Sequence, residues 1–338
     1  MKAFFIQEPG QTSVGAVPEP RLSAGEILLR IRMVGFCGTD LSTFRGKNPL
    51  VSYPRIPGHE ISATIVEVGN EVPGHFQGGQ NVTVLPYNSC GICASCRRGR
   101  TNACLANRTL GVQQDGAMSE FFKAPWQKVY AADGLSLREL SLVEPLAVGF
   151  HSVERGRIQS SDVVAVVGCG TVGLGAMAGA AARGATVIAI DLDDAKLALA
   201  RQAGAQHAVN SRTEHASERL KELTGGHGPD VIIEAVGTPD TFRFAIDEVA
   251  YTGRVVYIGY AKEPVSYQTK LFILKELDIL GSRNSLTEFP AVIEMLQKGL
   301  FPVESTISAT VPFQEAGAAL QAWSQAPQSF TKILVEVG

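Results

Sequence analysis

The first part of the chain carries short apolar segments that are interrupted at close intervals by proline and glycine. Runs rich in β-branched and aromatic residues, bounded by such turn residues, are typical of strands. Four of them fall before residue 145: Ile27–Ile31, Ile61–Val68, Val82–Leu85 and Ser119–Phe122. This pattern predicts an irregular β-barrel or β-sandwich domain, and it ends near Glu144 and Pro145.

Apolar strand-like runs alternate with helical segments from Asp162 onward. The strand candidates are Val163–Val167, Thr186–Ile190, Val231–Glu234, Arg254–Ile258 and Leu277–Leu280. The helix candidates between them include Asp193–Gln202, Ala216–Leu223 and Asp240–Ala250. Alternation of this kind predicts right-handed βαβ units and an α/β domain with a doubly wound parallel sheet.

The end of the chain returns to the earlier pattern. A helix is predicted over Phe289–Lys298, and β-rich stretches follow at Ile307–Val311 and Lys332–Val337. We therefore expect a discontinuous first domain over residues 1–147 and 289–338, and a second domain over residues 148–288. The length of 338 residues suits two domains.

Hydropathy and charge exclude two classes of partner. The uncharged stretch Val163–Ala182 contains five glycines, and its β-branched half gives way to an alanine and glycine run, so we interpret it as strand–turn–helix rather than a membrane span. The apolar run Met1–Ile6 is too short for a signal peptide. The net charge is −3, and no run of Lys or Arg is long enough to follow nucleic-acid phosphates. We expect a cytoplasmic protein with neither a membrane nor a nucleic-acid partner.

A glycine fingerprint follows the first predicted strand of the second domain. Gly168–Gly173 reads G-x-G-x-x-G and opens a predicted helix, whose free N–H groups favour a pyrophosphate. The next strand ends at Asp191, about twenty residues further on, where a carboxylate binds the adenosine ribose and repels a 2′-phosphate. The alternative is a generic glycine-rich turn with an exposed acid. The motif therefore favours NAD over NADP, bound by Gly168, Gly170, Thr171, Val172, Gly173 and Asp191.

Four of the six cysteines lie within fifteen residues, at Cys90, Cys93, Cys96 and Cys104. A secreted disulfide scaffold would be shorter and would spread its cysteines, so a metal site is the better interpretation. Four thiolates close a tetrahedral zinc site with no open position, which predicts a structural zinc ion. An iron–sulfur cluster is the main alternative, but the bacterial cluster motif has a shorter last gap followed by proline, whereas Leu105 follows here.

A second candidate metal site combines three kinds of ligand. Cys37 lies in the segment Gly35–Asp40, and His59 and Glu60 end the segment Pro57–Glu60. One thiolate, one imidazole and one carboxylate match a catalytic zinc ion with an open position for water or substrate. The spacing alone is equally compatible with a buried cysteine and a surface histidine.

Taken together, these motifs resemble the zinc-containing medium-chain alcohol dehydrogenases over essentially the whole chain. The matching segments are, in order, Cys37–Asp40, Gly58–Glu60, the four-cysteine loop, Val143–Val148 and the glycine fingerprint. The resemblance implies a GroES-like, β-rich catalytic domain and a Rossmann domain, with one catalytic Zn²⁺, one structural Zn²⁺ and NAD. It also implies a homo-oligomer, because relatives are commonly dimers or tetramers.

The resemblance implies roles for individual residues of the first domain. Cys37 and His59 would be catalytic zinc ligands, and Glu60 or Glu144 would complete the set of protein ligands. The polyol branch of the family has Glu where the liver-type enzymes have Cys, and Glu144 fits the polyol branch. Thr39 would pass the proton of the substrate outward.

Two further segments, Val112–Gly116 and Gly281–Asn284, resemble the polyol and sugar-acid branch, especially the L-galactonate oxidoreductase type. Many relatives have His at the position of Ser42, and sorbitol dehydrogenases have Arg-Tyr where this chain has Arg283-Asn284. We expect hydride transfer to NAD from a secondary hydroxyl of a small polar substrate, a sugar acid or polyol, with Ser42, Arg283 and Asn284 as candidate substrate residues. The alternatives are an L-threonine 3-dehydrogenase-like or other secondary-alcohol dehydrogenase, a zinc-free enone or quinone reductase, and a non-enzymatic zinc- and nucleotide-binding sensor.

Overall fold

The computed structural model describes residues 1–338, whose contacts group the chain into two units. The first unit comprises Met1–Glu144, Phe289–Gly299 and Val303–Gly338, and the second comprises Pro145–Glu288 and Leu300–Pro302. The chain first passes from one unit to the other inside a single helix, α3 (Leu137–Arg155), and returns at Phe289.

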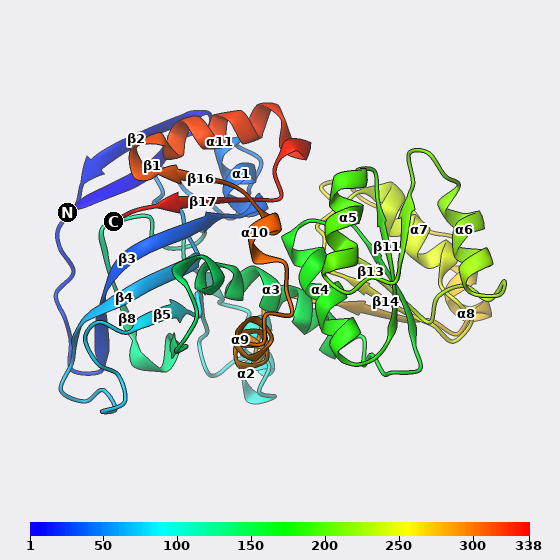
Figure 1. The fold of residues 1–338 in the computed structure, drawn as a ribbon, viewed down its shortest axis with the longest axis horizontal. Helices are drawn as coiled ribbons and strands as arrows, with labels where there is room; N and C mark the ends of the chain where they lie inside the picture. Colours follow the sequence, from blue (N-terminus) through cyan, green and yellow to red (C-terminus); the bar gives the residue numbers. More distant parts are fainter. The chain divides into compact units, whose positions relative to one another are not determined.

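The first unit is built on a seven-stranded sheet in the order β16-β17-β3-β4-β5-β9, with β8 also paired to β3 (Figure 1). All its pairings are antiparallel except that of β16 with β17. The strands are β3 (Glu26–Phe36), β4 (Glu60–Val68), β5 (Asn81–Val84), β8 (Phe121–Pro125), β9 (Val129–Ala131), β16 (Ile307–Pro312) and β17 (Lys332–Glu336). A hairpin of β1 (Lys2–Glu8) and β2 (Gln11–Ala16) stands beside them.

Strand β3 shows why this sheet forms. Ile27, Leu29 and Ile31 are fully buried and alternate with more exposed residues, as expected of a strand with one face on a core. From Val34 to Phe36 every residue is buried, because the end of the strand enters the interior. Packing of these buried residues fixes the end of β3, and the next residue, Cys37, is the first of the candidate site.

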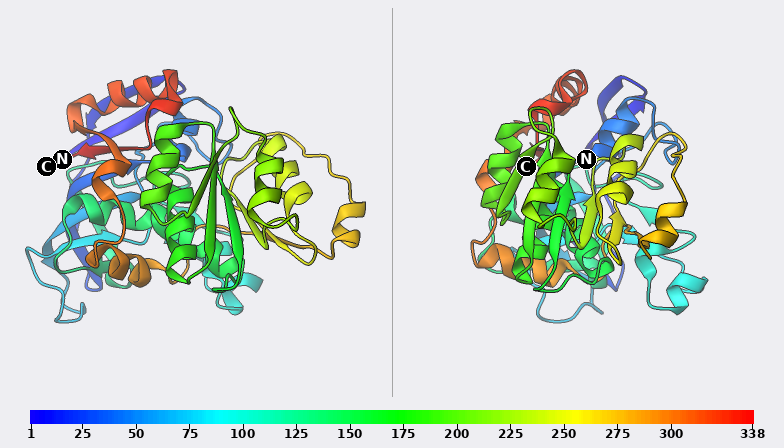
Figure 2. Two further views of the ribbon diagram at one scale, coloured as in Figure 1. Left: turned by 45° about the vertical axis from the view of Figure 1, so that its right-hand side comes forward. Right: turned by 90° about the vertical axis from the view of Figure 1, so that its right-hand side faces the viewer.

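The second unit contains a six-stranded sheet in the order β12-β11-β10-β13-β14-β15, with every pairing parallel. Helices lie on both faces of this sheet (Figure 2). The strands are β10 (Val163–Val167), β11 (Thr186–Asp191), β12 (His207–Asn210), β13 (Val231–Glu234), β14 (Arg254–Tyr257) and β15 (Asp278–Gly281). The strand order reverses between β10 and β13, and ligands of doubly wound sheets bind at such a switch point, beyond the carboxyl ends of the strands.

The predicted fold class is confirmed, and most predicted elements of the second unit are present within a few residues of their predicted bounds. The stretch Val163–Ala182 is strand β10 followed by helix α4 (Thr171–Ala182), as interpreted from its glycines. The chain has no helix with the length and hydropathy needed to cross a membrane. The strand predicted at Ser119 begins instead at Phe121, because Ser119 makes only an isolated bridge to Ala3.

Several elements escaped prediction. They are the β1–β2 hairpin, strand β12 and two helices of the first unit, α1 (Gly38–Phe44) and α11 (Ala316–Gln325). The helices that complete the two units are α2 (Ala94–Arg97), α5 (Asp194–Gln202), α6 (Ala216–Leu223), α7 (Pro239–Glu248), α8 (Lys270–Leu274), α9 (Phe289–Gln297) and α10 (Val303–Thr306).

Candidate active site and metal centres

Cys37 stands at the junction of β3 and α1. It is the N-cap of α1 with an extended backbone, and its N–H donates to the Asp40 carboxylate at 2.9 Å. Because Asp40 is fully buried, this bond fixes the start of the helix and with it the direction of the Cys37 side chain. Thr39 Oγ1 lies 3.7 Å from Cys37 Sγ, and Ser42 is half-buried further along the same helix.

His59 and Glu60 enter the site where β4 begins. Glu60 is paired with Gly35 in the β3–β4 register, and a Cβ on Gly35 would lie 2.0 Å from Glu60 Oε2, so only glycine leaves room for this carboxylate. His59 is 4% exposed and Glu60 is 1% exposed. The ligand atoms of Cys37, His59 and Glu60 all lie within 4.8 Å of one another. The structure thus brings together the three residues that the sequence suggested, and it rejects the alternative of a surface histidine.

Lys332 of β17 also reaches Glu60. Its ammonium donates to Glu60 Oε1 at 2.5 Å, to Glu60 Oε2, and to the Phe36 carbonyl at 3.0 Å. Lys332 is only 4% exposed, so the charge of Glu60 is balanced inside the protein.

Glu144 lies in α3 immediately before Pro145 and is 4% exposed. Its carboxylate accepts a hydrogen bond from the Tyr87 hydroxyl, and it stands outside the close group of Cys37, His59 and Glu60. Burial raises the pKa of Glu144 to about 7, against the opposing effect of His59.

The donor set fits a divalent cation. Four buried or half-buried acidic groups, Cys37, Asp40, Glu60 and Glu144, surround His59, whereas Lys332 is paired to Glu60. Burial lowers the pKa of His59, but Cys37 and Asp40 outweigh burial and raise it well above its usual value. Asp40 Oδ1 and His59 Nδ1 are both buried without a hydrogen-bond partner. A cation would balance this excess of negative charge, and a mixed thiolate, imidazole and carboxylate set is one that zinc accepts.

The four cysteines of the loop around α2 also gather at one point. The Sγ–Sγ distances are 3.5 Å for Cys93–Cys96, 3.8 Å for Cys93–Cys104 and 3.5 Å for Cys90–Cys104. Zinc–sulfur bonds of about 2.3 Å give a tetrahedron with edges of about 3.8 Å, which these distances approach. The Ser95 hydroxyl and backbone N–H groups lower the pKa of Cys93 to about 5, and burial raises that of Cys96 to about 11. Four sulfurs at these distances can all be thiolates only with a cation among them, and the site fits zinc.

The glycine fingerprint forms the turn between β10 and α4. Gly168 has a φ of +98°, which favours glycine, and a Cβ on Gly173 would lie 1.9 Å from the Gly168 carbonyl oxygen. A Cβ on Gly170, the N-cap of α4, would meet nothing within 4 Å. The backbone at Gly170 is therefore open to the approach of a ligand at the N-terminus of a twelve-residue helix.

Asp191 ends β11 and is tied to this turn. Its Oδ2 accepts the Cys169 N–H at 2.7 Å and its Oδ1 accepts the Leu192 N–H at 2.7 Å. The Asp193 N–H also donates to Oδ1 at 3.2 Å, so Oδ1 carries two hydrogen bonds, whereas Oδ2 carries one and can accept another. Asp193 instead caps α5, where its side chain accepts from Ala195 N–H at 2.8 Å.

Arg283 and Asn284 follow β15 in the second unit, and Asn284 has a φ of +55°. Both ends of their segment are anchored to α3. Arg155 Nε donates to the Gly281 carbonyl at 3.0 Å, and His151 Nδ1 lies 2.7 Å from Glu288 Oε1. His151 is thus a buried residue held against Glu288, and it is not one of the candidate metal ligands.

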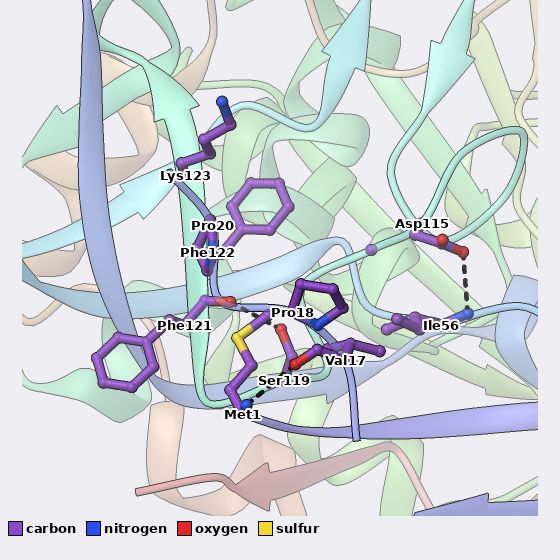
Figure 3. Close-up of a pocket in the computed structure, with 11 residues that line it drawn as sticks. Met1, Val17, Pro18, Pro20, Ile56, Asp115, Ser119, Phe121, Phe122 and Lys123 are labelled. Atoms are coloured by element: carbon purple, nitrogen blue, oxygen red, sulfur yellow. Dashed lines mark hydrogen bonds between the residues drawn. The ribbon is translucent and has the colours of Figure 1, made fainter. Parts of the chain in front are cut away.

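A pocket of about 350 Å³ lies elsewhere in the first unit (Figure 3). Its walls are largely apolar, with Pro18, Phe121 and Phe122 among them. Asp115 at its rim is already engaged by the Ile56 N–H at 3.3 Å and by Arg55 at 2.7 Å. None of the candidate metal-binding residues lines this pocket, and we assign it no role in the chemistry.

Sequence reasoning missed three residues of the site. Asp40 could have been found, since an acid three residues after an N-cap signals a capping box. Tyr87 and Lys332 carry no local signal, because their partners Glu144 and Glu60 are distant in the chain.

Comparison with known proteins places these sites in a family. Residues 23–134 match the alcohol dehydrogenase GroES-like domain, and residues 171–298 match the zinc-binding dehydrogenase domain. An L-galactonate-5-dehydrogenase from Escherichia coli K12 is 32% identical over 93% of this chain and 92% of its own. A sorbitol dehydrogenase from Bacillus subtilis is 31% identical over 99% and 97%. The chain belongs to the zinc-type medium-chain alcohol dehydrogenases.

Other members of this family vary in substrate and cofactor. An L-threonine 3-dehydrogenase from Bacillus licheniformis is 32% identical over 93% of each chain. The alcohol dehydrogenase RspB from Escherichia coli CFT073, solved with NADH, superposes with a TM-score of 0.91 at 31% identity, over 100% of this chain and 99% of that one. A zinc-binding dehydrogenase from Sinorhizobium meliloti, solved with NADP, has a TM-score of 0.91 at 28% identity, over 99% of each.

Proposed function

We propose that this zinc-type alcohol dehydrogenase oxidises a secondary hydroxyl of a sugar acid or polyol and transfers the hydride to NAD. The observation that carries the proposal is the buried convergence of Cys37, His59 and a glutamate, in a chain that also has a complete glycine fingerprint. The polyol and sugar-acid substrates of two relatives support the substrate class.

The catalytic metal would be held by Cys37, His59 and one glutamate. Lys332 already balances Glu60, whereas Glu144 has no cationic side chain against its carboxylate among its hydrogen bonds. We therefore favour Glu144 as the direct ligand, with Glu60 as the near alternative. When bound, zinc supplies Lewis acidity toward the substrate hydroxyl. Thr39, beside Cys37, would accept the released proton and pass it along α1, where Ser42 is half-buried.

The dinucleotide would lie against the glycine turn of the second unit. Gly168 and Gly173 would shape the turn, and Gly170 would admit the pyrophosphate. The N–H groups of Thr171 and Val172 lie at the N-terminus of α4, where they would donate to the pyrophosphate. The Asp191 carboxylate would accept from the adenosine ribose and repel a 2′-phosphate. A neighbour with NADP shows that the fold accommodates either cofactor, so the preference for NAD rests on Asp191.

Cys90, Cys93, Cys96 and Cys104 would hold a structural zinc ion. We further propose that the functional domains are a catalytic domain, residues 1–147 and 289–338, and an NAD-binding domain, residues 148–288. The two contact units support this division, and each contains most of one family match.

The exposed apolar residues Ile273 and Ile279, on α8 and the edge strand β15, support assembly into a homo-oligomer.

A spectroscopic screen tests the proposed reaction. Purified protein with zinc and NAD would be mixed with sugar acids, polyols and L-threonine, and NADH formation would be followed by absorbance. We expect turnover on a sugar acid or polyol, and none in a Cys37→Ala variant that still binds NADH. Turnover on L-threonine alone would replace the substrate class, and binding of NADH without turnover on any secondary alcohol would favour a sensor.

A further inference from the structure

Tyr87 connects the two candidate metal sites of the first unit. It lies in the short strand β6 (Tyr87–Asn88), three residues before Cys90. Its side-chain hydroxyl donates a hydrogen bond to Glu144 Oε1. Both partners are buried, since Tyr87 is 6% exposed and Glu144 is 4% exposed. A hydrogen bond to a buried carboxylate restricts its rotation and leaves its second oxygen free.

The backbone of Tyr87 is held on two sides. Strand β6 pairs with β7 (Arg108–Thr109), with Tyr87 opposite Thr109, and the Leu110 N–H donates to the Pro86 carbonyl at 3.0 Å. Lys128 Nζ donates to the Tyr87 carbonyl at 2.8 Å. The backbone that carries the Tyr87 side chain is therefore held in place, and the position of the hydroxyl depends on the hairpin formed by β6 and β7.

The same hairpin closes the four-cysteine loop, because Cys90 and Cys104 lie between its two strands. Asn107 links the loop to β7, since its N–H donates to the Cys104 carbonyl at 3.2 Å and its side chain donates to Thr109 Oγ1 at 2.9 Å. A metal that gathers the four sulfurs fixes both ends of the loop and lowers the entropy of the open hairpin.

We propose that Tyr87 is a positioning residue that holds the Glu144 carboxylate for the catalytic metal, and that the four-cysteine loop keeps Tyr87 in place through the β6–β7 hairpin. The inference rests on the proposed function, because Glu144 needs positioning only if the Cys37 site binds a metal. Outer partners of metal ligands typically change metal affinity by about 10- to 100-fold when they are removed. The structural site would in this way support the catalytic site as well as the fold.

The Tyr87→Phe variant removes only the hydroxyl. Protein loaded with zinc would be dialysed against graded concentrations of a chelator, and the zinc retained per chain would be measured. A Cys37→Ala variant identifies which zinc belongs to the catalytic site. We expect Tyr87→Phe to release that zinc at a chelator concentration about ten-fold lower than wild type, with the other zinc unchanged. Tyr257→Phe is the matched control, because it loses a hydroxyl bond to the Phe242 carbonyl in the second unit and should release zinc as wild type does.

Two outcomes separate the inference from the proposed function. If wild type holds one zinc per chain and Cys37→Ala keeps it, the proposal that the Cys37 site binds a metal is refuted. If wild type holds two and the release curves of Tyr87→Phe and wild type coincide, the role of Tyr87 is refuted. A cobalt-loaded sample gives an independent readout, since a displaced Glu144 should shift the visible spectrum of the catalytic site in Tyr87→Phe and leave it unchanged in Tyr257→Phe.

The dependence on the cysteine loop is tested by a double-mutant cycle. Cys90→Ser should weaken the catalytic zinc in the wild-type background and add little in the Tyr87→Phe background, because both changes act through the same contact. If the two changes lowered the affinity for the catalytic zinc independently, so that their fold-losses multiplied in the double variant, the proposed coupling would be wrong. If Cys90→Ser aggregates, Asn107→Ala replaces it, since that change loosens the link to Thr109 and leaves all four cysteines in place.

Discussion

The buried pair of Lys332 and Glu60 allows a quantitative test of the site's electrostatics. In Lys332→Met the apolar stem is retained but the ammonium is lost, which leaves Glu60 buried beside Cys37 and Asp40 without its ion-pair partner. Breaking one partner of a buried pair costs about 3–5 kcal/mol. The lost bond to the Phe36 carbonyl adds about 1 kcal/mol. We therefore expect the metal-free protein to lose about 4–6 kcal/mol of stability, a large part of the 5–15 kcal/mol that is typical of folded proteins.

The assay is urea unfolding of chelator-treated protein, followed by fluorescence. Adding Glu60→Gln to Lys332→Met removes the stranded charge and should restore all but about 1–2 kcal/mol. Lys298→Met is the control, because Lys298 and Glu294 form an exposed pair whose loss should cost less than about 1 kcal/mol. If Lys332→Met unfolded at the wild-type midpoint, or if the double variant were no more stable than the single one, Glu60 would not depend on Lys332 as argued.

Four further predictions concern the proposed roles. Cys104→Ser should lower the melting temperature far more than it changes turnover by the chains that remain folded, because a closed zinc site contributes folding energy; a wild-type melting curve with lost turnover would contradict this. Cys37→Ala should abolish turnover and leave the Kd for NADH nearly unchanged. Asp191→Ala should weaken the binding of NAD and reduce the preference of the enzyme for NAD over NADP, measured as the ratio of kcat/KM for the two cofactors. Arg283→Gln should raise KM for an acid substrate more than for its neutral polyol counterpart, and equal effects would make Arg283 structural.

The second unit was the more predictable half of the fold. Strands such as Val163–Val167 are buried on both faces, so they appear in the sequence as continuous apolar runs. Edge strand β12, which contains His207 and Asn210, has no such run and was missed. Helix α1 was missed for a different reason, because seven residues are too few to show a helical period.

The candidate site was predictable only where its residues sit in local motifs. Cys37 and His59 stand near glycines that the fold needs, since Gly58 has a φ of +105° and Gly35 leaves room for the Glu60 carboxylate, so their motifs record steric requirements. Glu60 was placed in the site as well, but its partner Lys332 is 272 residues away, and no local pattern marks a lysine whose role depends on a tertiary contact.

The structure adds an electrostatic difference between Glu60 and Glu144 as candidate zinc ligands. Both residues lie in recognisable motifs, and both are acids that zinc accepts, so at the level of sequence only the resemblance to the polyol branch favours Glu144. What distinguishes them is the partner each carboxylate has in the fold, an ammonium for Glu60 and a phenol hydroxyl for Glu144. An ammonium competes with a cation for the same carboxylate, whereas a neutral hydroxyl leaves the negative charge available to it. The chain thus contains two acids of similar burial and different charge balance, and that difference favours Glu144 as the metal ligand.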